Sequence, residues 1–146
     1  MEQPEYQTYS VHLYREENSP RSIVHVRDFS LDLGTTSGDP SAGFNPAETL
    51  LSALAGCITS SFLLIAKNSH VPVGAVSVEV SGIRQSTPPQ LVSANYTISV
   101  QSSATNDKID RLLSIAERNS TVVSTLRKAI PVHGSWKRLS EPSAFN

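Results

Sequence analysis

The sequence predicts an α+β domain on the basis of three observations. Residues 5–33 and 73–101 alternate between apolar and polar side chains, which is typical of β-strands. Between them, residues 49–66 carry no formal charge and are long enough for one buried helix. Residues 107–118 repeat apolar side chains with helical spacing, and a closing strand follows. At 146 residues the chain is most simply one domain, 1–146.

Residues 5–33 are expected to form two or three strands. The segment Asn18-Ser19-Pro20 interrupts the alternation and reads as a turn. Residues 34–43 are rich in glycine, serine and threonine, which indicates a loop of ordinary length.

The long helix has a clear start. Asn45 can cap it, Pro46 suits its first position, and Glu48 completes a capping box. Asn68 and Pro72 mark its end. Because the helix is apolar nearly all round, we expect it to be central and packed on several sides. The length of the helix approaches that of a membrane span, but serine, threonine and glycine lower its hydrophobicity. A buried core helix is therefore the preferred interpretation.

The second half of the chain completes the α+β pattern. A hairpin is expected from strands 73–85 and 91–101, joined by Thr87-Pro88-Pro89. A helix over 107–118 presents one apolar face and is predicted to end at Asn119; that face consists of Ile109, Leu112, Leu113 and Ala116. A short helix carrying Val122, Val123 and Leu126, a strand over 131–139 and a frayed tail over 141–146 follow.

Composition narrows the functional classes. A net charge of -1 without basic runs gives no footprint for nucleic acid or an anionic membrane. The first residues lack the basic and then apolar pattern of a signal peptide. A single cysteine excludes an internal disulfide and suits a reducing compartment, so a cytoplasmic location is expected.

That cysteine, Cys57, lies in the middle of the long helix and has two interpretations. It shares a helix face with Leu54 and Ser61, and a free cysteine in such a place often only packs. The other interpretation is a nucleophile, which requires the thiolate form. Cys57 lies about three turns into the helix, beyond the reach of the helix dipole, so a nearby cation would have to activate it.

Arg27 is the best candidate for that cation, because it stands among apolar strand residues. An exposed strand arginine is the alternative interpretation. The four histidines are isolated and lack the spacing of metal ligands. No metal or organic cofactor is implied.

The segment from Gly43 to Cys57 reads Gly-Phe-Asn-Pro-Ala-Glu-Thr-Leu-Leu-Ser-Ala-Leu-Ala-Gly-Cys. It resembles the signature of the OsmC/Ohr family, the osmotically induced and organic hydroperoxide resistance proteins. Residues 26–31 resemble the family strand that brings an arginine to the site, and the likeness extends over roughly 9–139. It implies an OsmC-like fold with antiparallel sheets around a long central helix, in an intertwined homodimer. It also implies a peroxidatic cysteine that attacks hydroperoxides.

The sequence departs from the family pattern at two positions. Ser120 stands where the family normally has a second, resolving cysteine, and a hydroxyl cannot close a disulfide. The glutamate that well-characterised members place ten residues before the cysteine is Ala47 here, whereas Glu48 is nine before it. Nine helical residues separate Glu48 from Cys57 by about 13.5 Å, so a cluster of both with Arg27 must draw on two subunits. A capping role alone is the other interpretation of Glu48.

Together these observations predict a one-cysteine, thiol-dependent peroxidase with an antioxidant role. Cys57 is the expected nucleophile, Arg27 its activator and Glu48 the residue that orients Arg27. Ser120, Leu54 and Ser61 are expected to line the site, and replacing Ser120 by alanine is expected to matter little. The expected partners are a second copy of the chain, a hydroperoxide substrate and an external thiol reductant, with no nucleic acid and no membrane. The alternative is a non-catalytic dimer that binds a small apolar ligand, with Cys57 structural.

Overall fold

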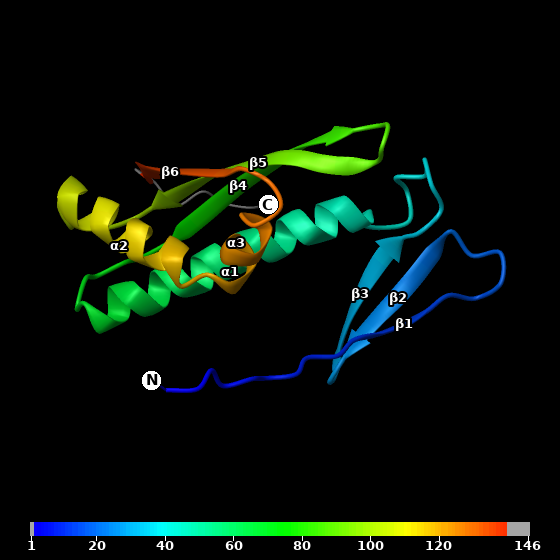
Figure 1. Cartoon of the computed structure of the whole chain (residues 1–146), viewed down its shortest axis with the longest axis horizontal. Helices are drawn as coiled ribbons and strands as arrows, with labels where there is room; N and C mark the ends of the chain where they lie inside the picture. Colours follow the sequence, from blue (N-terminus) through cyan, green and yellow to red (C-terminus); the bar gives the residue numbers. More distant parts are fainter. Residues whose placement is uncertain (1, 140–146) are drawn as a thin grey trace. The chain divides into compact units, whose positions relative to one another are not determined.

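The computed structural model of the chain describes residues 2–139. They form two compact units, which divide between Thr49 and Leu50 (Figure 1). The expected tail, 141–146, lies outside the described residues.

The first unit holds a three-stranded antiparallel sheet, as the alternation predicted. Its strands are β1 (His12–Tyr14), β2 (Arg21–Val26) and β3 (Phe29–Gly34), with β2 in the middle. The predicted turn between β1 and β2 is confirmed, and within it Asn18 has a φ of 62°. Asparagine tolerates this left-handed conformation better than most residues, which explains its place there.

Arg27 lies in a turn, which corrects the prediction of a strand arginine. Val26 pairs with Phe29, so Arg27 and Asp28 alone connect β2 to β3. A two-residue hairpin turn needs a positive φ to match the twist of its strands, and Arg27 has a φ of 52°. The arginine is therefore held in a conformation that usually selects glycine or asparagine.

The long helix α1 (Pro46–Asn68) begins where the sequence predicted. The side chain of Asn45 accepts a hydrogen bond from the backbone N–H of Glu48 at 2.8 Å. The carboxylate of Glu48 accepts one from the N–H of Asn45 at 3.0 Å. These reciprocal bonds confirm the capping box and satisfy N–H groups that the first helical turn leaves unpaired.

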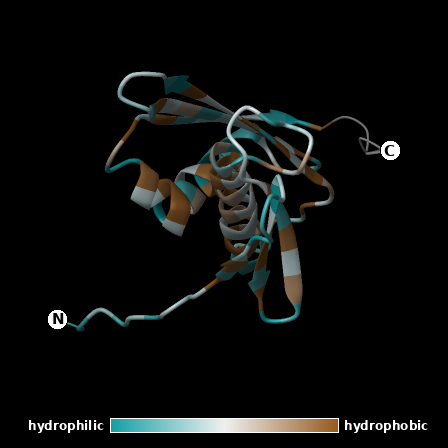
Figure 2. Cartoon of the chain, turned by 90° about the vertical axis from the view of Figure 1, so that its right-hand side faces the viewer, coloured by the Kyte–Doolittle hydropathy of each residue, from teal (hydrophilic) through white to brown (hydrophobic). Residues whose placement is uncertain are grey.

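The second unit contains the other sheet, formed by β4 (Val76–Gln85), β5 (Gln90–Val100) and β6 (Val132–Arg138). β4 and β5 form the predicted antiparallel hairpin, but β6 runs parallel to β5, so the expectation of purely antiparallel sheets is corrected. The reason is the crossover between β5 and β6, which contains α2 (Asn106–Arg118) and α3 (Thr121–Leu126). The helices of this unit lie on one side of its sheet (Figures 1 and 2).

The core of the second unit lies between this sheet and the helices. α1 contributes residues four apart, Leu54, Ile58, Phe62 and Ala66. β5 contributes Ala94, Tyr96, Ile98 and Val100, and α2 presents the four apolar residues predicted for it, 109, 112, 113 and 116. In Figure 2 these elements carry apolar bands, whereas the segment before β1 is mostly hydrophilic to neutral.

Within the single chain, burial of α1 is one-sided, whereas the sequence predicted packing on several sides. Leu50, Leu63 and Leu64 are exposed, Leu64 to 57%. By length and composition alone α1 could also cross a membrane. However, its four buried side chains belong to a packed protein core, which is how the central helix of a soluble domain is used.

Candidate active site

The sulfur of Cys57 receives two hydrogen bonds from the start of α3. The hydroxyl of Ser120 donates one at 3.0 Å, and the backbone N–H of Val122 donates another at 3.4 Å. The cysteine residue is partly exposed. Hydrogen bonds of this kind are stronger when the acceptor is charged, so the pair of donors suits a thiolate.

The corner between α2 and α3 (residues 118–121) places these donors. Asn119 ends α2 as its C-cap, and Ser120 caps α3 in an extended conformation. The oxygen of Ser120 accepts a hydrogen bond from the N–H of Val123 at 3.4 Å while its hydrogen is directed at the sulfur. Ser120 is fully buried, and Val123 anchors α3 in the core. Ser120 therefore both caps the start of α3 and donates a hydrogen bond to the thiol.

Ser61 and Leu54, the other residues expected at the site, have different places. Ser61 lies one helical turn after Cys57, and its hydroxyl donates to the carbonyl of Asn119 at 3.4 Å, so it ties α1 to the same corner. Leu54, one turn before Cys57, is fully buried among core residues. Its contacts are therefore made with the protein interior.

Arg27 and Glu48 are described within the first unit. The Arg27 side chain is exposed, and its guanidinium carbon lies 5.6 Å from the ring centre of Phe29, within the range of a cation–π contact. Glu48 is exposed at the start of α1, where its carboxylate serves the capping box.

Sequence reasoning missed Val122, because it contributes through its backbone. The signal that could have found it is the serine that precedes a short helical pattern. A helix that starts at Thr121 has unpaired N–H groups in its first turn, and these are natural hydrogen-bond donors. Within residues 2–139, no group of three or more histidine, cysteine, aspartate or glutamate side chains could hold a metal ion.

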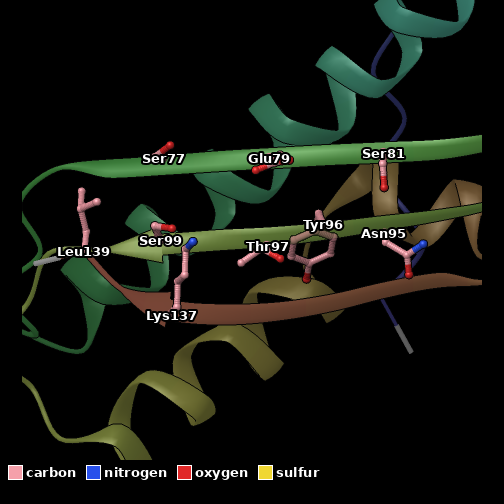
Figure 3. Close-up of a pocket in the computed structure, with 9 residues that line it drawn as sticks. All are labelled: Ser77, Glu79, Ser81, Asn95, Tyr96, Thr97, Ser99, Lys137 and Leu139. Carbon is pink, nitrogen blue, oxygen red and sulfur yellow. The ribbon is translucent and has the colours of Figure 1, made fainter. Parts of the chain in front are cut away.

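A polar hollow of about 370 Å³ lies on the sheet formed by β4, β5 and β6, on the face opposite the helices (Figure 3). It is lined by Ser77, Glu79, Ser81, Asn95, Tyr96, Thr97, Ser99, Lys137 and Leu139. The polar members alternate along β4 and β5 with the residues that face the core. The sheet therefore separates this hollow from α1 and from Cys57.

The chain is an α+β protein with a thiol on its long central helix. A sheet covers this helix, and the start of the short helix α3 contacts the sulfur. The chain belongs to the OsmC-like protein family, whose model matches residues 37–134. A search of the curated proteins gives no match.

Solved structures support the same fold. An OsmC-like protein from Mycoplasma pneumoniae superposes with a TM-score of 0.84 at 19% identity, over 91% of this chain and 98% of the other. A Legionella pneumophila protein described as organic hydroperoxide resistance protein OsmC and predicted redox protein gives 0.69 at 17% identity, over 92% and 99%. The organic hydroperoxide resistance protein OhrB of Bacillus subtilis gives 0.65 at 15% identity, over 90% and 98%. At these identities the likeness concerns the fold.

Proposed function

We propose that this protein is a soluble, cytoplasmic, one-cysteine peroxidase that reduces organic hydroperoxides, with hydrogen peroxide as a second substrate. The observation that carries the proposal is Cys57, a partly exposed residue whose sulfur accepts hydrogen bonds from Ser120 and Val122. A residue that only filled space would need no donors directed at its sulfur. Two neighbours by fold are named for organic hydroperoxide resistance, which agrees with this chemistry.

The reaction starts from the Cys57 thiolate. Its sulfur attacks the terminal oxygen of the hydroperoxide, an S–O bond forms and the O–O bond breaks. The electron pair leaves on the other oxygen, which takes a proton and departs as the alcohol, while Cys57 becomes a sulfenic acid. The donors at Ser120 and Val122 hold the sulfur in one position during this attack.

Return to the thiol requires an external reductant, because Ser120 offers a hydroxyl. A thiol from another molecule attacks the sulfenic sulfur, water leaves, and a mixed disulfide forms. A second external thiol then attacks this mixed disulfide. The two external thiols leave joined as a disulfide, and Cys57 is released as the thiol. The cycle consumes two thiols for each hydroperoxide.

Arg27 and Glu48 enter this proposal through a homodimer. A guanidinium near the sulfur would stabilise the thiolate and bind the peroxide, and a carboxylate would fix its direction. Two observations support a functional role for Arg27: it is exposed, and it occupies a strained turn position that usually selects glycine or asparagine. The exposed apolar side chains of α1, Leu50, Leu63 and Leu64, are of the kind that subunit interfaces and apolar substrates cover.

Intact-mass measurement tests the proposal. The protein is treated with an alkyl hydroperoxide or hydrogen peroxide, with and without a small thiol. We expect a gain of one oxygen atom without thiol and a mixed disulfide with it, both absent in the matched variant Cys57→Ser. An unchanged mass under a large excess of both peroxides would instead support a packing role for Cys57 in a ligand-binding dimer.

A further inference from the structure

A second set of contacts lies next to the corner between α2 and α3, which carries Ser120. The hydroxyl of Tyr96, on β5, donates to Oε1 of Glu117 in the last turn of α2. The other carboxylate oxygen of Glu117 pairs with Nη2 of Arg127 at 3.2 Å. Both oxygens of this carboxylate are therefore engaged, one by a sheet residue and one by the residue that caps the end of α3.

Arg127 extends these contacts to the last strand. Its Nε and Nη2 atoms both donate to the carbonyl of Val132, the first residue of β6, at 3.2 and 3.0 Å. Tyr96, Glu117, Arg127 and Val132 thus connect four elements in sequence: β5, α2, α3 and β6. We call these four residues the corner network.

The corner network is joined directly to the residue that contacts the thiol. The backbone N–H of Ser120 donates to the carbonyl of Glu117 at 3.3 Å. Glu117 lies three residues before Ser120, and Arg127 directly follows α3. Because the network fixes both ends of the short segment 117–127, it limits how far the hydroxyl of Ser120 and the N–H of Val122 can move relative to α1.

The contact between Tyr96 and Glu117 is largely buried. Tyr96 is 2% exposed, and the side chain of Glu117 is 19% exposed. Burial is the main reason why the pKa of Tyr96 is raised, and the hydrogen bond to Glu117 adds to it, so the phenol remains a donor. Gly134 on β6 provides the space for this hydrogen bond. A Cβ at position 134 would overlap the phenol of Tyr96 and the carboxylate of Glu117.

We propose that Glu117, held by Tyr96 and Arg127, is a positioning residue that sets the two hydrogen-bond donors on the sulfur of Cys57. The role rests on the proposed function, because it acts on the same thiol. Glu117 does not touch the sulfur, and it works through the placement of Ser120 and Val122. A merely structural role would instead make the contact between Tyr96 and Glu117 one of several that attach α2 to the sheet.

The chain offers a matched control for that distinction. The indole N–H of Trp136 donates to Oδ1 of Asp110, so a second aromatic donor on the same sheet contacts a second carboxylate on the same helix. Asp110 lies two helical turns before Glu117, away from the corner. Trp136→Phe and Tyr96→Phe therefore each remove one aromatic donor from a carboxylate of α2, but only the second one loosens the corner.

The experiment measures the rate at which iodoacetamide alkylates Cys57 as a function of pH. It compares the unmodified protein with Tyr96→Phe, Glu117→Gln, Gly134→Ala and Trp136→Phe, and the unfolding free energy of each variant is measured alongside. We expect the pH midpoint of alkylation to rise by about half to one pH unit in the first two variants, since a hydrogen bond to a charged group is weakened. Trp136→Phe should leave the midpoint in place, even if it lowers the unfolding free energy.

Gly134→Ala gives an independent route to the same result, because it displaces Tyr96 and Glu117 without removing a polar group. If it fails to fold, Tyr96→Phe and Glu117→Gln still decide the matter. Equal midpoints in Tyr96→Phe, Glu117→Gln and Trp136→Phe would overturn the positioning role. Alkylation reads the thiol without any peroxide, so shifted midpoints in a protein that fails to react with peroxide would support positioning and contradict the peroxidase function alone.

Discussion

Ser120 donates a hydrogen bond to the sulfur of Cys57 at 3.0 Å, across 63 positions of sequence. The serine stands at the position where the resemblance to the family leads one to expect a second cysteine. A cysteine at this position would attack the sulfenic sulfur of Cys57 and close a disulfide, whereas the serine donates a hydrogen bond to that sulfur. This geometry gives Ser120 a larger expected role than the sequence alone suggested.

Ser120→Ala should slow the reaction of Cys57 with an alkyl hydroperoxide by roughly tenfold, because one hydrogen bond to a charged acceptor contributes about 1.5 kcal/mol. The rate is measured by stopped flow under excess peroxide. Ser124→Ala is the matched control, since Ser124 is exposed on the same short helix. Equal rates in the two variants would show that the hydroxyl of Ser120 has no part in the reaction.

Ser120→Cys should create an intramolecular disulfide after one treatment with peroxide. The present distance from oxygen to sulfur shows that a second sulfur would lie within bonding reach after a small side-chain rotation. Intact mass should fall by two hydrogen atoms, and the thiol requirement should shift toward dithiols. Ser124→Cys should not form this bond, and a sulfenic acid that persists in Ser120→Cys would argue against the observed geometry.

Local signals explain which elements could be predicted. The capping box of Asn45 and Glu48 fixed the start of α1, and the apolar spacing from Ile109 to Ala116 fixed the buried face of α2. The parallel pairing of β6 was not visible, because strand direction depends on the crossover between β5 and β6 rather than on either strand.

Contacts between distant residues explain what was missed in the site. Cys57 and Ser120 came from the motif and its departure from the family pattern. The bond between Tyr96 and Glu117 joins residues 21 apart on different elements, and no local pattern marks such a pair. The turn at Arg27 was missed because arginine and aspartate are not the glycine-rich pair that usually signals a two-residue hairpin.

Glu48→Gln should separate the two roles assigned to Glu48. Glutamine also completes a capping box, so the unfolding free energy should change by less than about 0.5 kcal/mol. If Glu48 orients Arg27 through its charge, the reaction with peroxide should still slow by roughly tenfold or more. Glu48→Ala should lose stability as well, by about 1 kcal/mol. An unchanged rate in Glu48→Gln would leave capping as the whole role of this residue.

Arg27→Gly should make the protein more stable and less active at once. Glycine adopts a φ of 52° without strain, so the unfolding free energy should rise by up to about 1 kcal/mol. The guanidinium is lost, so the peroxide reaction should slow by about two orders of magnitude if it stabilises the thiolate. Arg84→Met, at an exposed position on β4, is the control for the loss of one positive charge. Full activity in Arg27→Gly would remove Arg27 from the mechanism.

Tyr96→Phe should change how stability depends on alkaline pH. Burial, followed by the hydrogen bond to Glu117, raises the pKa of Tyr96 above its ordinary value near 10. Above that ordinary value the unfolded chain loses the phenol proton while the folded protein keeps it. The unfolded state then binds fewer protons, and stability falls by up to about 1.4 kcal/mol per pH unit.

The contribution of this phenol is therefore complete below about pH 10 and declines as the pH rises toward the folded-state pKa. Phenylalanine cannot ionise, so the stability difference between the unmodified protein and Tyr96→Phe should be largest at neutral pH and should narrow from about pH 10 upward. Urea unfolding between neutral pH and about pH 11 measures it, with Tyr14→Phe, an exposed tyrosine, as the control. If the stability difference between the two proteins stays constant across this range, the phenol ionises equally in the folded and the unfolded state. The bond to Glu117 would then not hold the phenol proton.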